Sequence, residues 1–424
     1  MLCFKNRWIN FFIKESLSKF AILFLFAAVQ FSALLPLYSK IPKPEMMKDI
    51  VFDFQEKMYS MQMNRIFALN LIILCLWTSC KRADDEPIYP ATPISRLYIS
   101  FSDIANSDTQ VYQNAVVIDP ADSAGYIPAP SGANTQPRLG MGITYSPDLR
   151  QGFQVSRNDT TIKYFSVNDA GVIGTSTRSF KDTIHLYMPR AIRYDNKSDQ
   201  LFITNDHPDS ASLNIYYNPS RLVGQQSPRK RLKLANLPWG ISTNMTLNTS
   251  DSLLLLSMQG NTKEIWGFAL KDIASIQDTF INNAKPNYTI TIAGANDIRG
   301  ITYSPRLDIL VLSDLGPAKL TDNPSNNSVD GKIYVIENAK QAIMAGGTIT
   351  PTRIITGAAT GLVDPIDVAI TDLPNRNQFI YVIDRARRLI RFALDANGNI
   401  EPETSRALSL TPEFMYLDSR GPNE

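Results

Sequence analysis

The chain has 424 residues, of which 44% are hydrophobic and 19% are charged. It can therefore bury a core, and wholesale disorder is excluded. Its 42 basic and 40 acidic residues nearly cancel. That balance lacks the basic stripe with which proteins follow nucleic-acid phosphates, so we expect no nucleic-acid partner.

Residues 63–80 have the pattern of a bacterial export signal. Arg65 supplies the positive start, and Ile66 to Trp77 form an apolar stretch too short to span a bilayer comfortably. The small residue Ser79 directly precedes Cys80. This pattern resembles the lipobox of bacterial lipoproteins, which implies that Cys80 is acylated and anchors the chain in a lipid bilayer.

The segments on either side of this signal require separate interpretations. Residues 1–62 contain a second apolar stretch, Phe20 to Tyr38. Because a lipoprotein signal works at the N-terminus, we interpret residues 1–62 as the product of a mis-assigned start codon, with a transmembrane segment as the alternative. Residues 81–95 contain an acidic cluster at residues 84–86 and are then rich in proline, which is typical of a semi-rigid tether.

The acidic part of the tether resembles the tags that send some lipoproteins to the outer face of the outer membrane. We therefore expect an outer-membrane lipoprotein exposed on the cell surface, with the periplasmic face as the alternative.

The region after Cys80 offers little catalytic machinery. It contains no cysteine, which excludes disulfides, cysteine-ligated metals and cysteine nucleophiles there. The histidines are His185 and His207, and the usual hydrolase, metalloprotease and phosphate-loop motifs are missing. The sequence therefore favours a protein that is not an enzyme.

A motif recurs five times after the tether. A Gly, Ala or Asp precedes Ile or Val, often with Tyr two residues later, and the Ile or Val falls at residues 143, 192, 241, 301 and 368. Each copy is followed by a polar turn, an apolar run, an alternating strand and a weaker fourth strand. Four short strands per repeat predict an all-β protein of the β-propeller class.

The two ends of the repeat region complete the same pattern. Residues 96–100 and 113–118 match the second and third strands of a blade, and residues 414–417 match its inner strand. Joining them would close the ring and remove exposed sheet edges. We predict six four-stranded blades over residues 96–420, closed by the C-terminal strand. Seven blades are the alternative, because residues 120–140 have no clear assignment.

The clearest repeat lies at residues 365–392 and contains Pro-Ile-Asp-Val-Ala, then Phe-Ile-Tyr-Val-Ile-Asp, then Arg-Leu-Ile-Arg-Phe. It resembles the NHL repeat of six-bladed, TolB-like propellers, and the resemblance extends in degenerate form over residues 96–418. The resemblance implies the fold but leaves the function open, because propellers carry many different chemistries.

The loops that enter the inner strands and those that leave the second strands of a propeller share the face around the channel mouth. Seven residues are expected there by register: Arg157, Arg190, Asp206, Trp239, Arg299, Asp314 and Asp384. Such a set suits a sugar or another polar or anionic ligand. Alternatively, each aspartate caps its own turn. A polar insertion at residues 316–331 lies on the same face and is either a recognition loop or a tolerated insertion.

These features favour a lipid-anchored binding module that presents its mouth to a polymer, peptide or protein, without a cofactor. One alternative is a metal-dependent lactonase or related hydrolase, since six-bladed enzymes resembling this fold hold one divalent cation in the channel. Ca²⁺ would be the most suitable ion, and its candidate ligands are Asn205, Asp206, Asp314 and Asp384. A second alternative is an accessory subunit of a surface nutrient-capture complex.

Overall fold

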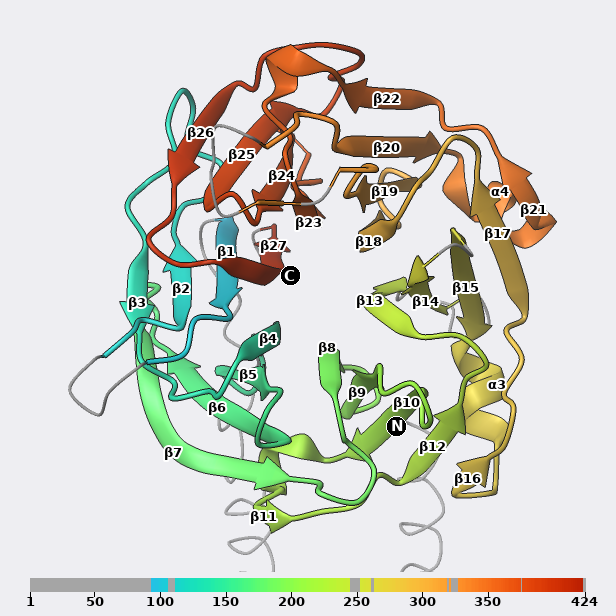
Figure 1. Ribbon diagram of the computed structural model, residues 1–424. Coiled ribbons are helices and arrows are strands. Elements are labelled where there is room, and N and C mark those ends of the chain that lie inside the picture. The colour runs from blue at the N-terminus through green and yellow to red at the C-terminus, as the bar shows by residue number, and fades with distance from the viewer. Residues whose placement is uncertain are drawn as a thin grey trace, which may run out of the picture. The chain divides into compact units, whose positions relative to one another are not determined.

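Six β-sheets stand in a ring around a central channel (Figure 1). The computed structural model describes residues 93–105, 111–244, 252–260, 263–318, 320–321, 327–374 and 376–421. The predicted extension, export signal, Cys80 and most of the tether lie outside these residues. Within the described part, no helix has the length and apolar character needed to cross a membrane. The arrangement confirms the predicted six-bladed β-propeller.

Each blade contributes one strand to each of four concentric layers. The inner strands are β4 (Gly140–Ser146), β8 (Pro189–Asp195), β13 (Pro238–Asn244), β18 (Ile298–Ser304), β23 (Pro365–Ile370) and β27 (Pro412–Arg420). The second strands are β5 (Gln151–Ser156), β9 (Gln200–Asn205), β14 (Leu253–Met258), β19 (Ile309–Asp314), β24 (Phe379–Asp384) and β1 (Ile94–Phe101).

The outer half of each blade repeats with the same order. The third strands are β6 (Thr161–Val167), β10 (Ser212–Tyr217), β15 (Glu264–Ala269), β20 (Lys332–Glu337), β25 (Arg388–Ala393) and β2 (Ala115–Ile118). The fourth strands are β7 (Ile173–Lys181), β12 (Lys230–Lys233), β17 (Tyr288–Ile292), β22 (Arg353–Thr356), β26 (Thr404–Ala407) and β3 (Ser131–Ala133). Short helices are α3 (Leu270–Ser275), α4 (Ala339–Ala345), η3 (Pro219–Arg221) and η7 (Ala358–Thr360).

The second strands are buried on both faces, because each blade is packed between two neighbours. Every residue of β14 and of β24 is buried. A strand covered on both sides reads as a continuous apolar run rather than an alternating one. This is why the sequence shows runs such as Leu253 to Leu256 at these positions.

The C-terminal strand closes the ring. β27 pairs with β1 in antiparallel register from Ile94–Arg420 to Phe101–Pro412, and β1 continues into β2 and β3. Figure 1 shows the dark-red β27 beside the blue β1 at the channel. Since β3 occupies part of residues 120–140 as the fourth strand of this blade, the seven-bladed alternative is wrong.

Three sheets contain a fifth strand that the sequence pattern does not predict. β11 (Gly224–Gln225) pairs in parallel with β7, β16 (Phe280–Ile281) with β12, and β21 (Gly347–Ile349) with β17. We call these three fifth strands straps. Each strap belongs by sequence to the next blade along the chain, where it lies between the third and fourth strands of that blade. The straps cover the outer edges of their sheets and so protect them from pairing with other chains.

The small residue of the repeated motif is required by a close approach between inner strands. A Cβ atom on Gly142, Gly240 or Gly300 would meet backbone atoms of the next inner strand at 2.6, 2.7 and 2.5 Å, respectively. In the last repeat, Asp367 takes this place. Its Oδ2 accepts the N–H of Met415 on β27 at 2.9 Å, and its Oδ1 accepts the N–H of Val368 at 2.9 Å. The carboxylate thus joins β23 to the closing strand.

Asp367 makes the stability of the propeller depend on pH. Burial raises the pKa of Asp367 to about 7, although the two N–H bonds and the charge of Arg193 oppose the shift. An unfolded aspartate has a pKa of about 3.9, so the native state holds an extra proton between about pH 4 and pH 7. The free energy of unfolding therefore falls as the pH rises through this window.

We expect urea unfolding to show this loss between about pH 4 and pH 7. Asp367→Asn, which like the protonated acid carries no charge, should remove much of the slope. Equal slopes in the two proteins would show that other groups cause the pH dependence.

Candidate functional site at the channel mouth

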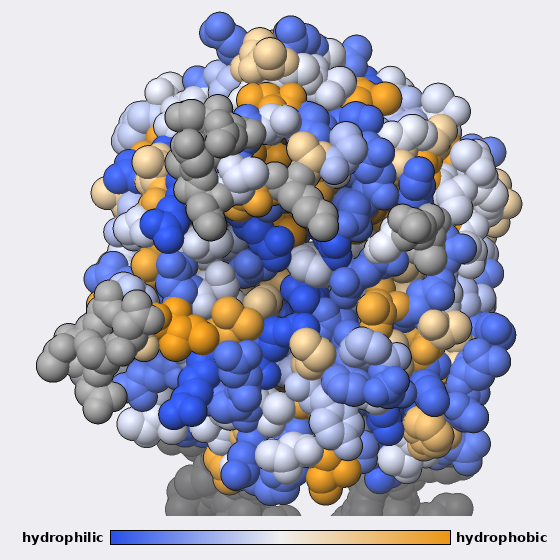
Figure 2. Space-filling model, in the orientation of Figure 1, coloured by the Kyte–Doolittle hydropathy of each residue, from blue (hydrophilic) through white to orange (hydrophobic). Residues whose placement is uncertain are grey.

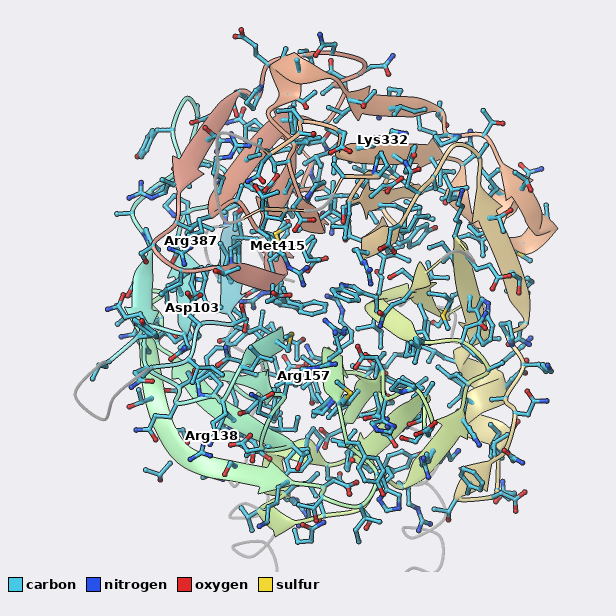
Figure 3. The ribbon with its side chains drawn as sticks, in the orientation of Figure 1. Asp103, Arg138, Arg157, Lys332, Arg387 and Met415 are labelled. Carbon is cyan, nitrogen blue, oxygen red and sulfur yellow. The ribbon has the colours of Figure 1, made fainter. Side chains whose placement is uncertain are left out.

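A repeated backbone hydrogen bond defines the mouth of the channel. In all six blades, the residue after the second strand donates its N–H to the carbonyl oxygen of the residue before the inner strand, at 2.8 to 3.1 Å. The six donors are equivalent positions around the ring: Ser102, Arg157, Asp206, Gln259, Leu315 and Arg385. Figure 3 shows Arg157 beside the central channel, near β4 and β8.

Strand pairing separates residues that the sequence pattern groups together. Asp314 pairs with Ile298 and Asp384 with Pro365, each at the last position of a second strand. Both aspartates therefore lie one residue before the mouth position that Arg157 and Asp206 occupy. A displacement of one residue along a strand turns a side chain to the opposite face.

The side chains of Asp314 and Asp384 bind the turns beside them. Asp314 accepts the N–H groups of Asn296, Asp297 and Gly316 at 2.7 to 3.0 Å and the hydroxyl of Tyr334 at 3.0 Å. The carboxylate of Asp384 accepts three N–H groups, at 2.8 to 3.1 Å, from Val363, Asp364 and Ala386. Both carboxylates thus occupy the turn-capping geometry that the sequence leaves open as an alternative.

Asp206 instead joins two arginines across neighbouring blades. Its Oδ1 lies 2.7 Å from Nη1 of Arg157, and its Oδ2 accepts Nε of Arg190 at 2.5 Å. The amide of Gln259 also donates to Oδ2, at 3.1 Å. Burial lowers the pKa of Arg190 to about 10, and Asp206 opposes that shift. Such a pair is stable only while each buried charge keeps its partner.

Trp239 lies between guanidinium groups at the centre of the mouth. The Cζ atoms of Arg190 and Arg299 lie 3.6 and 3.9 Å from its ring centroid, and that of Arg385 lies at 5.5 Å. Because the indole is only 5% exposed, these cation–π contacts are largely desolvated and each contributes up to about 2 kcal/mol. The sequence predictions Arg157, Arg190, Asp206, Trp239 and Arg299 therefore lie in one connected network.

Four charged residues of this network are missing from the sequence prediction. Arg385 donates to both carboxylate oxygens of Glu413 at 2.7 and 3.1 Å and lies 4.0 Å from Asp364. Asp297 pairs with Arg299. Burial raises the pKa of Asp364 to about 6, although Arg385 opposes that shift. The repeat register contains the signal for two of them, since Arg385 is equivalent to Arg157 and Glu413 to Arg190.

Several donors of this network have no hydrogen-bond partner among the described residues. These donors are Nε1 of Trp239 and both Nε and Nη1 of Arg299. The acceptor Oδ1 of Asp297 also has no hydrogen-bond partner there. A rim cavity of about 520 Å³ lies next to this network, and Asp297, Asp364 and Arg385 are among the residues that line it. Hydrophilic residues gather around the centre of this face (Figure 2). Within this buried network, more donors than acceptors therefore lack a hydrogen-bond partner.

The proposed metal ligands do not fit a divalent cation. Asp314 and Asp384 are used by backbone N–H groups, and Asp206 is held between two guanidinium groups, which a cation would have to displace. Asn205 accepts the N–H of Met188 and donates to the carbonyl of Ser210, both at 2.8 Å. Among the described residues, no three His, Cys, Asp or Glu side chains are grouped to hold a metal.

No protein-family model and no curated protein matches the sequence. Among solved structures, a Bacteroides fragilis protein provisionally assigned as a 6-phosphogluconolactonase gives a TM-score of 0.49 at 13% identity, over 77% of this chain and 98% of that one. A nidogen–laminin complex gives a TM-score of 0.43 at 12% identity, over 76% and 98%. Neither likeness bears on the chemistry of the mouth.

Proposed function

We propose that this protein is a lipid-anchored cell-envelope propeller whose mouth binds an acidic polymer. The observation that carries the proposal is the surplus of unpartnered donors on Trp239 and Arg299, in a network whose members Asp297 and Arg385 line an open rim cavity. Carboxylate oxygens accept from guanidinium groups in a paired geometry that hydroxyl groups do not match. The lactonase alternative has no comparable support, because the carboxylates it requires are already bound to the protein.

The internal acids make the mouth selective rather than generally adhesive. Asp206, Asp297, Asp364 and Glu413 balance the charge of Arg157, Arg190, Arg299 and Arg385. A ligand carboxylate must therefore offer hydrogen bonds that the internal pairs leave unmade, since net charge alone attracts it little. This requirement favours a ligand with carboxylates at fixed spacing, as in a uronic-acid glycan or an acidic peptide.

Residues Pro87–Glu424 form one compact unit that contains all six blades, and Trp239 and Trp266 are its tryptophans. In this unit, Trp266→Phe leaves Trp239 as the single indole reporter. We expect polygalacturonate or polyglutamate to change its fluorescence, and the methyl-esterified polymer to do so at least tenfold more weakly, a difference of about 1.4 kcal/mol.

Arg385→Gln should abolish most of this preference. Arg387→Gln is the matched control, because this side chain is 54% exposed and pairs with Asp103 away from the indole. If both polymer forms bind alike, or if Arg385→Gln retains the preference, the mouth does not recognise carboxylates. The two polymers separate a glycan ligand from a peptide ligand.

The anchor is tested separately from the mouth. In a bacterial host fed an alkyne analogue of palmitate, the full chain should carry the label and sediment with membranes, and Cys80→Ala should lose both properties. A label that persists in Cys80→Ala would contradict acylation at this residue, whatever the outcome at the mouth.

A further inference from the structure

Two aromatic rings lie next to each other on the surface of the blade of β8. The ring centroids of Tyr187 and His207 are 5.4 Å apart, and the ring planes are inclined by 47°. Tyr187 is 51% exposed, and His207 is half-buried. Because folding leaves this aromatic surface in water, a ligand that covers it gains free energy. We call these two residues the aromatic pair.

The backbone places the aromatic pair beside the buried ion pairs of the mouth. Tyr187 precedes Met188, whose carbonyl oxygen accepts the N–H of Asp206 at 3.1 Å and Nη1 of Arg157 at 3.3 Å. His207 directly follows Asp206 in the chain. A ligand bound at the guanidinium groups of the mouth can therefore extend onto both rings.

The loop that carries Tyr187 is held on both sides of the exposed ring. Before the ring, the carboxylate of Asp182 accepts two N–H groups of the loop at 2.9 and 3.0 Å, and Leu186 is completely buried. After the ring, the N–H of Met188 donates to Oδ1 of Asn205 at 2.8 Å. Tyr187 is thus presented from a fixed backbone, which lowers the entropy lost when a ligand binds.

Asn205 joins this loop to the loop that carries His207. Asn205 is completely buried, and its amide nitrogen donates to the carbonyl oxygen of Ser210 at 2.8 Å. Within that second loop, Nδ1 of His207 accepts the N–H of Asp209 at 3.3 Å. The neutral imidazole therefore carries its proton on Nε2, which makes Nε2 a hydrogen-bond donor.

We propose that the aromatic pair stacks a sugar ring, so that the acidic polymer bound at the mouth is a uronic-acid glycan. This inference rests on the proposed function and selects one of its two ligand classes. The C–H face of a pyranose ring is flat and apolar and covers the ring of Tyr187, while a sugar hydroxyl accepts from Nε2 of His207. An acidic peptide such as polyglutamate offers flexible methylene groups there instead of a rigid ring.

The positions of the aromatic pair and of the rim cavity require a ligand longer than one sugar. The rim cavity is lined by Asp297 and Arg385, from the loops around β18 and β24, whereas the aromatic pair belongs to the blade of β8. The blade that carries Trp239 stands between them in the ring. A ligand that contacts both places therefore crosses the mouth, as several linked sugars do.

Isothermal titration of the full chain tests the proposal with polygalacturonate, its methyl ester and polyglutamate of similar length. Tyr187→Ala should weaken the binding of polygalacturonate at least tenfold, or about 1.4 kcal/mol. It should weaken the methyl ester by a similar factor, because stacking does not involve the carboxylate. Its effect on polyglutamate should be less than about threefold. Tyr187→Phe keeps the ring and should bind polygalacturonate within about threefold of the wild-type chain.

Tyr126→Ala is the matched control. Tyr126 is 60% exposed and lies on the loop after β2, at the opposite end of the channel, so its removal should change none of these affinities.

The proposal is overturned if polygalacturonate does not bind the wild-type chain, if Tyr187→Ala binds it as tightly as the wild-type chain, or if polyglutamate loses as much affinity. The proposed function fails in a different way. If the wild-type chain binds the methyl ester as tightly as the acid and Tyr187→Ala weakens both, the sugar stacks on the aromatic pair but the mouth does not recognise carboxylates.

Discussion

Asp206→Ala should lower the free energy of unfolding by about 3 to 5 kcal/mol, the usual cost of removing one partner from a buried ion pair. The side chains of Asp206, Arg157 and Arg190 are 3%, 8% and 10% exposed, so solvent would compensate little for the lost charge. Two guanidinium groups would then face each other without an anion between them. Urea denaturation followed by circular dichroism measures the loss.

Two further variants show whether unpaired charge is the cause. Asp209→Ala removes an exposed carboxylate three residues away and should change stability by less than about 0.5 kcal/mol. Adding Arg190→Met to Asp206→Ala removes one of the stranded charges and should recover part of the stability. If Arg190→Met lowers the free energy of unfolding as much in the Asp206→Ala background as it does in the wild-type chain, the ion pairs do not stabilise this part of the ring.

A chain that ends at Thr411 should not unfold cooperatively, because it lacks the strand that closes the ring. β27 pairs with β1 along its whole length, and its residues Phe414 and Met415 are buried in the core. Each of these two large side chains alone contributes about 2 to 5 kcal/mol when removed from a core, against a total stability of about 5 to 15 kcal/mol. Calorimetry should show a broad transition or none.

The same experiment has a direct rescue. A synthetic peptide of residues 412–420 should add to the exposed edge of β1 and restore a cooperative transition, as an extended peptide does when it completes a sheet. A chain that ends at Gly421 is the control for truncation and should melt like the full chain. A cooperative transition in the chain ending at Thr411, without the peptide, would mean that five blades and a partial sixth are stable by themselves.

The fold could be predicted from the sequence because every blade repeats the same residue pattern at its inner and second strands. The Gly142, Gly240 and Gly300 positions mark where inner strands approach each other, and the apolar runs mark strands buried on both faces. The straps could not be predicted in this way. A strand of two residues such as Phe280–Ile281 has no periodicity, and its partner β12 lies about fifty residues earlier in the chain.

Only part of the candidate site could be predicted from the sequence, because the motif marks the inner strands and leaves the ends of the second strands unmarked. Arg190, Trp239 and Arg299 occupy the second position of an inner strand, which the motif marks directly. The ends of the second strands carry no such mark, and an aspartate that caps a turn looks the same in sequence as one that faces the channel. Strand register separates Asp206 from Asp314 and reveals Arg385 and Glu413, whose pairing joins segments that the sequence does not connect.

The straps also decide how the propeller divides into modules. Since β16 belongs by sequence to the blade of β15 and by pairing to the sheet of β12, a cut between these two repeats leaves no complete sheet, and β11 and β21 have the same effect at the repeats that they join. A chimera that exchanges one repeat with a relative would therefore join a strap from one parent to an edge from the other. In these three places, the smallest exchangeable unit is a repeat together with the outer strand of its predecessor, so neighbouring modules overlap in this part of the ring.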